Sequence, residues 1–149
     1  MTEVWFYHLE RARLEGVLPD LLEKTLARGA RALVKAGSGE RLDALDAHLW
    51  TYRDDAFLPH GRAGEPEAGR QPVVLGVGDE APNAATFLFL VDGATADDVS
   101  GFERCITIFD GADDEAVKAA RVFWKEVKSK HYQAAYWRQS AEGRWEKQA

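Results

Sequence analysis

The chain has 149 residues, 46% of them hydrophobic, and a formal net charge of −6 at pH 7. This length supports one hydrophobic core and is too short for two ordinary domains, so we expect a single domain over residues 1–149. The sequence has no apolar run of membrane length and no basic-then-apolar leader, so we expect a cytoplasmic protein without a membrane partner.

Helices and strands alternate along the first third of the chain. Pro19 suits the first turn of a helix, Gly29 suits its end, and Ser38 can cap the helix that follows it. In that second helix, Leu42, Leu45 and Leu49 recur at helical spacing. The elements expected here are a strand over 4–9, a helix over 18–30, a strand over 31–35 and a helix from 38 to about 50.

The rest of the chain continues the alternation after a Gly/Pro-rich connection over 53–72. The apolar runs at 73–75 and 87–91 fit strands that are buried on both faces. The elements expected here are strands over 73–76, 86–91 and 104–109, helices over 97–102 and 113–130, and a hairpin of 136–139 with 144–147. The whole predicts an α/β fold: a three-layer, mostly parallel, Rossmann-like sheet with helices on both faces and a C-terminal hairpin or extended tail.

The long helix at 113–130 lies in a part of the chain whose charge is opposite to the rest. Residues 116–149 hold eight Lys or Arg against three Asp or Glu, and residues 1–115 hold eleven against twenty-two, so +5 and −11 sum to −6. A basic end on an acidic protein indicates an anionic partner.

Helical spacing separates the faces of this helix. Ala120, Phe123 and Val127 fall on a core stripe, with Val117 and Trp124 at its edge. A single basic row runs beside Trp124 and consists of Lys118, Arg121, Lys125 and Lys128. Two interpretations remain open: a solvated face that covers a half-buried Trp, or a pocket for an acidic peptide with an apolar tip.

Catalytic motifs are missing from the sequence. Neither phosphate-loop nor dinucleotide-binding glycine patterns occur, and the turn at 35–39 lacks the Lys and hydroxyl expected after its second Gly. The four His show no metal-ligand spacing, Cys105 lies in an apolar run that favours a buried thiol, and Asp54 and Asp55 suit a turn. We expect no catalytic residue, no metal and no cofactor.

The connection after the second helix contains unusual apolar residues. Trp50 ends that helix, and Phe57 and Leu58 follow among polar residues. These side chains either fold back onto their own domain or form a hydrophobic patch for a second protein.

Three motifs together resemble the chi subunit family of bacterial DNA polymerase III. They are L-W-x(6)-F-L-P-H-G at 49–61, F-Y-H-L at 6–9 and A-R-x-x-W-K at 120–125. The resemblance implies a non-catalytic accessory of the clamp-loader assembly whose Rossmann-like sheet has no nucleotide site.

The resemblance also implies two partner surfaces. Chi proteins bind the acidic, Phe-terminated C-terminal tail of single-stranded DNA-binding protein through an Arg, an aromatic residue and a Lys, which here are Arg121, Trp124 and Lys125. Lys118, Lys128 and Val117 would extend that site. Trp50, Phe57 and Pro59 would hold the psi subunit or a replication-repair helicase, and DNA would be contacted only indirectly.

Two other classes of function stay open from the residues alone. The basic helix and its Trp could bind single-stranded nucleic acid directly, although the net charge of −6 argues against this. The turn at 35–39 could belong to a small α/β nucleotide-binding enzyme.

Overall fold

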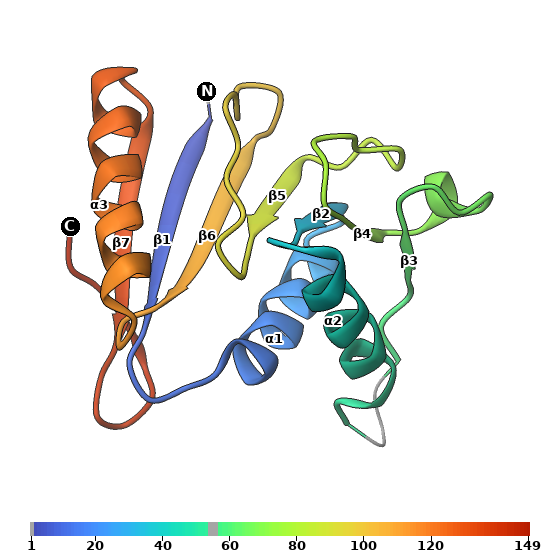
Figure 1. Cartoon of the computed structure of the whole chain (residues 1–149), viewed down its shortest axis with the longest axis horizontal. Helices are drawn as coiled ribbons and strands as arrows, with labels where there is room; N and C mark the ends of the chain where they lie inside the picture. Colours follow the sequence, from blue (N-terminus) through green and yellow to red (C-terminus); the bar gives the residue numbers. More distant parts are fainter. Residues whose placement is uncertain (1, 54–56) are drawn as a thin grey trace.

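An eight-stranded, mostly parallel sheet organises the computed structural model, which describes residues 2–53 and 57–149 (Figure 1). Asp54 and Asp55, expected in a turn, lie outside the described residues. In chain order the elements are β1 (Glu3–Leu9), α1 (Leu14–Ala27), β2 (Ala32–Lys35), α2 (Gly39–Thr51), β3 (His60–Arg62), the 3₁₀ turn η1 (Ala68–Arg70), β4 (Val73–Gly76), β5 (Phe87–Leu90), β6 (Arg104–Asp110), α3 (Asp114–Ser129), β7 (Gln133–Gln139) and β8 (Trp145–Lys147).

The strand order is β3-β4-β2-β5-β6-β1-β7-β8. Every neighbouring pair is parallel except β7 with β8, which pair antiparallel. In the central register, Val4 of β1 lies opposite Cys105 of β6 and Ala134 of β7. The predicted α/β class and mostly parallel sheet are therefore confirmed.

Alternating side chains of the strands fill two hydrophobic clusters, one on each face of the sheet. Val34 and Phe89 join α1 and α2 in the first cluster, whereas Phe6, Leu33 and Leu88 join α3 in the second. All four residues of β5 are buried, as the continuous apolar run predicted. In the residues that the structure covers, no helix combines the length and the apolar character needed to cross a bilayer.

Two helix boundaries were predicted correctly because a side chain caps each one. Ser38 Oγ accepts the Arg41 N–H at 3.2 Å at the start of α2. Asp113 Oδ1 accepts the N–H groups of Glu115 and Ala116 at 3.0 and 3.4 Å at the start of α3. These bonds satisfy backbone donors that a helix start leaves free.

Two other expectations were wrong in their boundaries or type. α1 begins at Leu14 rather than at 18, so Pro19 lies inside the helix, and the buried Val17 extends the packed face toward its start. No helix forms over 97–102, because Asp98 Oδ1 accepts the Ser100 N–H at 2.9 Å and favours a turn.

β3 is a strand that the periodicity did not predict. Its three residues lie in the Gly/Pro-rich connection and pair with β4, with His60 opposite Val73. β3 forms because it pairs with a strand farther along the chain, so the pattern of residues within the segment gives little indication of it. β3 forms one edge of the sheet, far from α3 (Figure 1).

Candidate functional site

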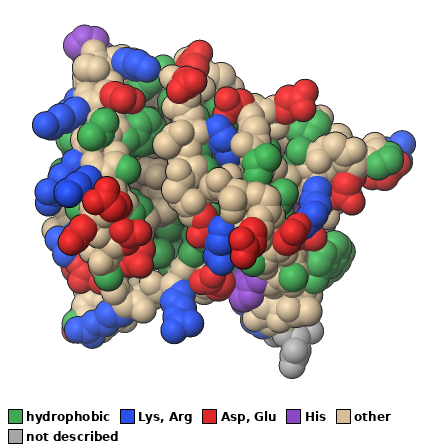
Figure 2. All heavy atoms as spheres, in the orientation of Figure 1, with side chains coloured by type: hydrophobic (Ala, Val, Ile, Leu, Met, Phe, Trp, Pro, Cys, Tyr) green, Lys and Arg blue, Asp and Glu red, His purple; other side chains and the backbone are tan. Residues whose placement is uncertain are grey.

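The predicted basic row lies on the exposed side of α3. Lys118, Arg121, Lys125 and Lys128 are all exposed, and Lys and Arg side chains gather over α3 along the left edge of Figure 2. Lys118 Nζ lies 3.6 Å from Glu115 Oε1, but this ion pair is exposed and so contributes little to stability. Across residues 2–53 and 57–149, no carboxylate lies within ion-pair distance of Arg121 or Lys125. These two cations therefore remain available to an external anion.

Trp124 forms the apolar wall beside these cations. Its indole is half-buried and packs edge-on against Phe6 and Tyr136, with ring centroids 5.2 and 6.0 Å apart. Lys128 Nζ lies 5.7 Å from the centroid of the indole, and Val117 packs against the same cluster. The core thus holds the indole in place and leaves part of it next to the positive charge.

Two residues near this surface were missed by sequence reasoning. The Tyr136 hydroxyl lies 2.6 Å from His8 Nδ1, behind Trp124. Burial raises the pKa of Tyr136, and the nearby Arg121 cation opposes that rise. Burial and Arg138 lower the pKa of His8, while Asp110 opposes the decrease. Because β1 and β7 are far apart in sequence, no local signal could link these side chains.

The second predicted surface lies at the end of α2 and in the segment before β3. Trp50 is 52% exposed and Phe57 is 74% exposed, and their ring centroids are 6.2 Å apart. Pro59 is half-buried, whereas Leu58 is buried in the core rather than in the exposed patch. Trp50 also contacts His60, with ring centroids 4.2 Å apart and the ring planes tilted by 41°. The structure therefore brings Trp50 and Phe57 together as an exposed aromatic pair.

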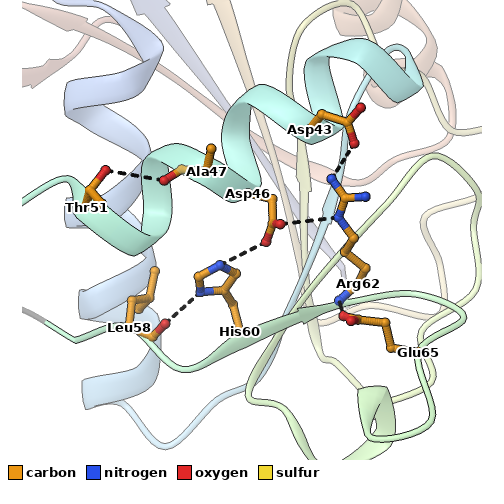
Figure 3. Close-up of polar contacts among 8 residues, drawn as sticks. All are labelled: Asp43, Asp46, Ala47, Thr51, Leu58, His60, Arg62 and Glu65. Atoms are coloured by element: carbon orange, nitrogen blue, oxygen red, sulfur yellow. Dashed lines mark hydrogen bonds and ion pairs between the residues drawn. The ribbon is translucent and has the colours of Figure 1, made fainter.

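A polar cluster surrounds His60, the residue that contacts Trp50 (Figure 3). His60 Nδ1 lies 2.7 Å from the Leu58 carbonyl oxygen, and His60 Nε2 lies 3.1 Å from Asp46 Oδ1. Arg62 pairs with Asp43 and, at 3.3 Å from its Nε, with Asp46 Oδ2. These contacts connect α2 to β3 and to the Leu58 carbonyl group, which follows Phe57 in the chain.

The turn at 35–39 is filled by the protein's own groups. Lys35 Nζ lies 2.5 Å from both Asp79 Oδ1 and the Thr95 carbonyl oxygen, so its charge is already neutralised. A side chain at Gly37 would collide with the Asp92 carbonyl, so the backbone is closely packed at this turn. The arrangement offers little room for a phosphate.

Candidate catalytic and metal-binding groups are also sparse. Cys105 is completely buried, as predicted, and burial raises the pKa of its thiol to about 12, which disfavours the nucleophilic thiolate. Within the described ranges, no group of three or more His, Cys, Asp or Glu side chains could hold a metal ion.

Comparison with known proteins identifies the family. Residues 1–135 match the family model described as "DNA polymerase III chi subunit, HolC". The chain is 22% identical over 109 residues to the "Probable DNA polymerase III subunit chi" of Rickettsia prowazekii, a match that covers 73% of this chain and 66% of that protein. It is 34% identical over 87 residues to the "DNA polymerase III subunit chi" of Pseudomonas aeruginosa, covering 56% of this chain and 59% of the relative. The matched regions thus span somewhat less than two thirds of these relatives. Because the family model covers most of the chain, the chain belongs to the DNA polymerase III chi subunit family.

Proposed function

We propose that the protein is a non-catalytic accessory subunit of the bacterial replicase that acts in the cytoplasm during DNA replication. In this proposal it binds the acidic C-terminal tail of single-stranded DNA-binding protein and links that protein to the clamp-loader assembly. The observation that carries the proposal is the pair of exposed cations, Arg121 and Lys125, beside the half-buried Trp124; in the described structure neither cation has a carboxylate partner.

The chemistry of this surface matches such a tail. Arg121 and Lys125 can form charge-assisted hydrogen bonds with aspartates and with a terminal carboxylate. The apolar edge made by Trp124 and Val117 can accept the terminal Phe ring. Lys118 and Lys128 extend the positive rim, although Lys118 is partly occupied by Glu115. The basic row then serves peptide binding, and contact with DNA is indirect.

In the same proposal, Trp50, Phe57 and Pro59 hold a second protein, either the psi subunit or a helicase. Trp50 and Phe57 are exposed, and aromatic residues are typical anchors of protein interfaces. α3 and β3 lie at opposite ends of the structure (Figure 1), so the two partners could bind at the same time. The sheet between them would act as a Rossmann-like, three-layer scaffold, with β7 and β8 as its terminal hairpin.

A titration with a fluorescent peptide tests the tail site. The peptide carries the acidic, Phe-terminated tail sequence, and the variant is the double charge reversal Arg121→Glu with Lys125→Glu. Each charged hydrogen bond contributes about 1.5–3 kcal/mol, so we expect affinity to fall by about 100-fold or more. Lys24→Glu, an equally exposed charge reversal on α1, is the control and should bind normally. Unchanged affinity in the folded double variant would remove the assignment.

Direct binding of single-stranded nucleic acid is the alternative that the basic row also supports. A gel shift with an oligonucleotide and the purified protein, free of single-stranded DNA-binding protein, separates the two functions. If the wild-type protein binds the oligonucleotide and the Arg121→Glu, Lys125→Glu variant does not, the result would favour the alternative. If the protein were a nucleotide-binding enzyme, addition of a nucleotide would raise its melting temperature. We do not expect this result, because the turn at 35–39 is filled by the protein's own groups.

A further inference from the structure

A pocket next to Trp50 indicates the chemistry of the second partner. It is open to solvent, has a volume of about 350 Å³, and its lining includes Asp46, Trp50, His60, Glu65, Glu67 and Gln71. We propose that this pocket receives an arginine or lysine side chain of the protein that docks on Trp50 and Phe57. The inference rests on the proposed function of that surface and adds the class of partner that it selects.

The charge of the lining favours a cation over an anion. Three carboxylates line the pocket, from Asp46, Glu65 and Glu67, and its lining as described contains no Lys or Arg. Glu67 pairs with Arg70 at 3.3 Å, but both side chains are largely exposed, so that pair is weak. A segment that is rich in carboxylates, or that ends in a C-terminal carboxylate, would be repelled by this pocket, whereas the cations of α3 would attract it.

The carboxylate of Asp46 keeps capacity to accept further hydrogen bonds. His60 is only 3% exposed and its Nε2 makes no hydrogen bond, although Asp46 Oδ1 lies 3.1 Å away. Arg62 Nε likewise approaches Asp46 Oδ2 at 3.3 Å without a hydrogen bond. Neither contact has hydrogen-bond geometry, which leaves the carboxylate oxygens able to accept from a guanidinium or an ammonium group.

Trp50 supplies a matching wall for a cation. Its exposed indole can receive a planar guanidinium by stacking, which favours Arg over Lys. Phe57 next to it offers an apolar contact to a neighbouring side chain of the same partner. The site therefore fits a segment that carries an apolar residue and a cationic residue close together.

Addition of a strand to β3 is the less suitable mode of binding. Arg62 donates its backbone N–H to Glu65 Oε1 at 2.5 Å, so this donor of the edge strand is already used. The pocket and the aromatic pair then provide the recognition, through side chains rather than backbone.

A dipeptide series tests this inference by NMR on the ¹⁵N-labelled protein. The probes are N-acetyl-leucyl-arginine amide, its neutral citrulline isostere and its glutamate counterpart, each added at millimolar concentration. We expect saturable shifts of the Trp50 indole N–H and the Gly61 amide with the arginine probe, and about fivefold or greater weakening with citrulline. The glutamate probe should bind most weakly.

Matched variants locate the effect. Glu65→Gln with Glu67→Gln keeps an acceptor for the Arg62 N–H and should reduce the preference for arginine over citrulline, because Asp46 is then the one carboxylate left among the three in the lining. Glu142→Gln, an exposed change in the loop before β8, should leave the preference intact. Equal binding of the arginine and citrulline probes, stronger binding of the glutamate probe, or no shift at Trp50 would each overturn the inference. If one of these results is obtained, a pull-down from the native extract separates two explanations. A partner that is retained by wild type and not by a Trp50→Ala, Phe57→Ala variant would show that the proposed surface binds a protein and that only its selectivity for a cation is wrong.

Discussion

The surface on α3 and the surface around Trp50 differ in whether their charged groups are paired within the protein. In the described part of the chain, Arg121 and Lys125 on α3 have no carboxylate within ion-pair distance. Around Trp50, Arg62 and His60 approach the carboxylates of α2. The two cations of the first surface are thus unpaired within the described residues, whereas the groups near Trp50 join α2 to β3. We therefore expect unpaired charge beside an aromatic side chain to indicate a ligand-facing site better than charge alone does.

The two surfaces also differ in what supports their Trp. Trp124 rests on Phe6, which is completely buried, whereas Trp50 rests on His60 and is half exposed. Phe6→Ala should lower the free energy of unfolding by about 3–5 kcal/mol, because it leaves a cavity below α3. Urea unfolding monitored by circular dichroism measures this loss. A loss below about 1 kcal/mol would mean that the core beneath Trp124 collapses to fill the space.

Removal of the aromatic pair should break the second surface and spare the first. Trp50→Ala with Phe57→Ala should weaken binding of the second partner by about 30-fold or more, as is typical of interface anchors worth 2 kcal/mol or more. Retention of proteins from the native extract by the immobilised variant measures the effect, with binding of the tail peptide as the internal control. Retention equal to wild type would contradict the role of the pair, and loss of tail binding would show that the two surfaces are coupled.

Salt should distinguish the two surfaces further. If the tail binds to the exposed cations of α3, as proposed, its affinity should fall by about tenfold as the Debye length shrinks from about 30 Å at 0.01 M salt to about 3 Å at 1 M. Binding at Trp50 and Phe57, which has a larger apolar part, should fall less. Fluorescence anisotropy of the tail peptide across this series provides the test. An affinity independent of salt would argue against the cations as the main contacts.

The smallest effect is expected from His8, which contacts Tyr136 behind Trp124. Burial and Arg138 lower the pKa of His8 in the folded protein, so the unfolded chain binds a proton more readily. The stability that neutral His8 provides is present above the unfolded pKa of about 6.5 and is lost as pH falls toward the lowered folded pKa. Urea unfolding at about pH 7.5 and about pH 5.5 measures this loss. His8→Gln should reduce the pH dependence, and an unchanged dependence would assign it to other groups.

The fold was predictable where short-range pattern determines structure. The core stripe of α3 with Val127 and the Ser38 cap both depend on neighbours within a few residues. β3 was missed because its pairing with β4 comes from tertiary structure. The helix expected over 97–102 was wrong because a side-chain hydrogen bond of Asp98 favours a turn.

The candidate sites were predictable only in part, for the same physical reason. The basic row follows from helical spacing on one element, and the structure leaves its cations exposed. The contact between His8 and Tyr136 joins residues 128 positions apart, and the Asp46–His60 contact joins α2 to an unpredicted strand. Such long-range contacts have no signal in residue spacing. The pocket beside Trp50 could therefore not be predicted from the sequence, because it depends on contacts that only the folded structure shows.

The five Trp residues of the chain allow one direct test of the central claim, which is that α3 binds an acidic chain terminus. The ¹⁵N-labelled protein is titrated with the acidic, Phe-terminated tail peptide, and the five indole N–H signals are followed. We expect a saturable shift of the Trp124 indole that disappears in the Arg121→Glu, Lys125→Glu variant, with the Trp50 indole unchanged. A saturable shift of the Trp50 indole with none at Trp124 would contradict this claim.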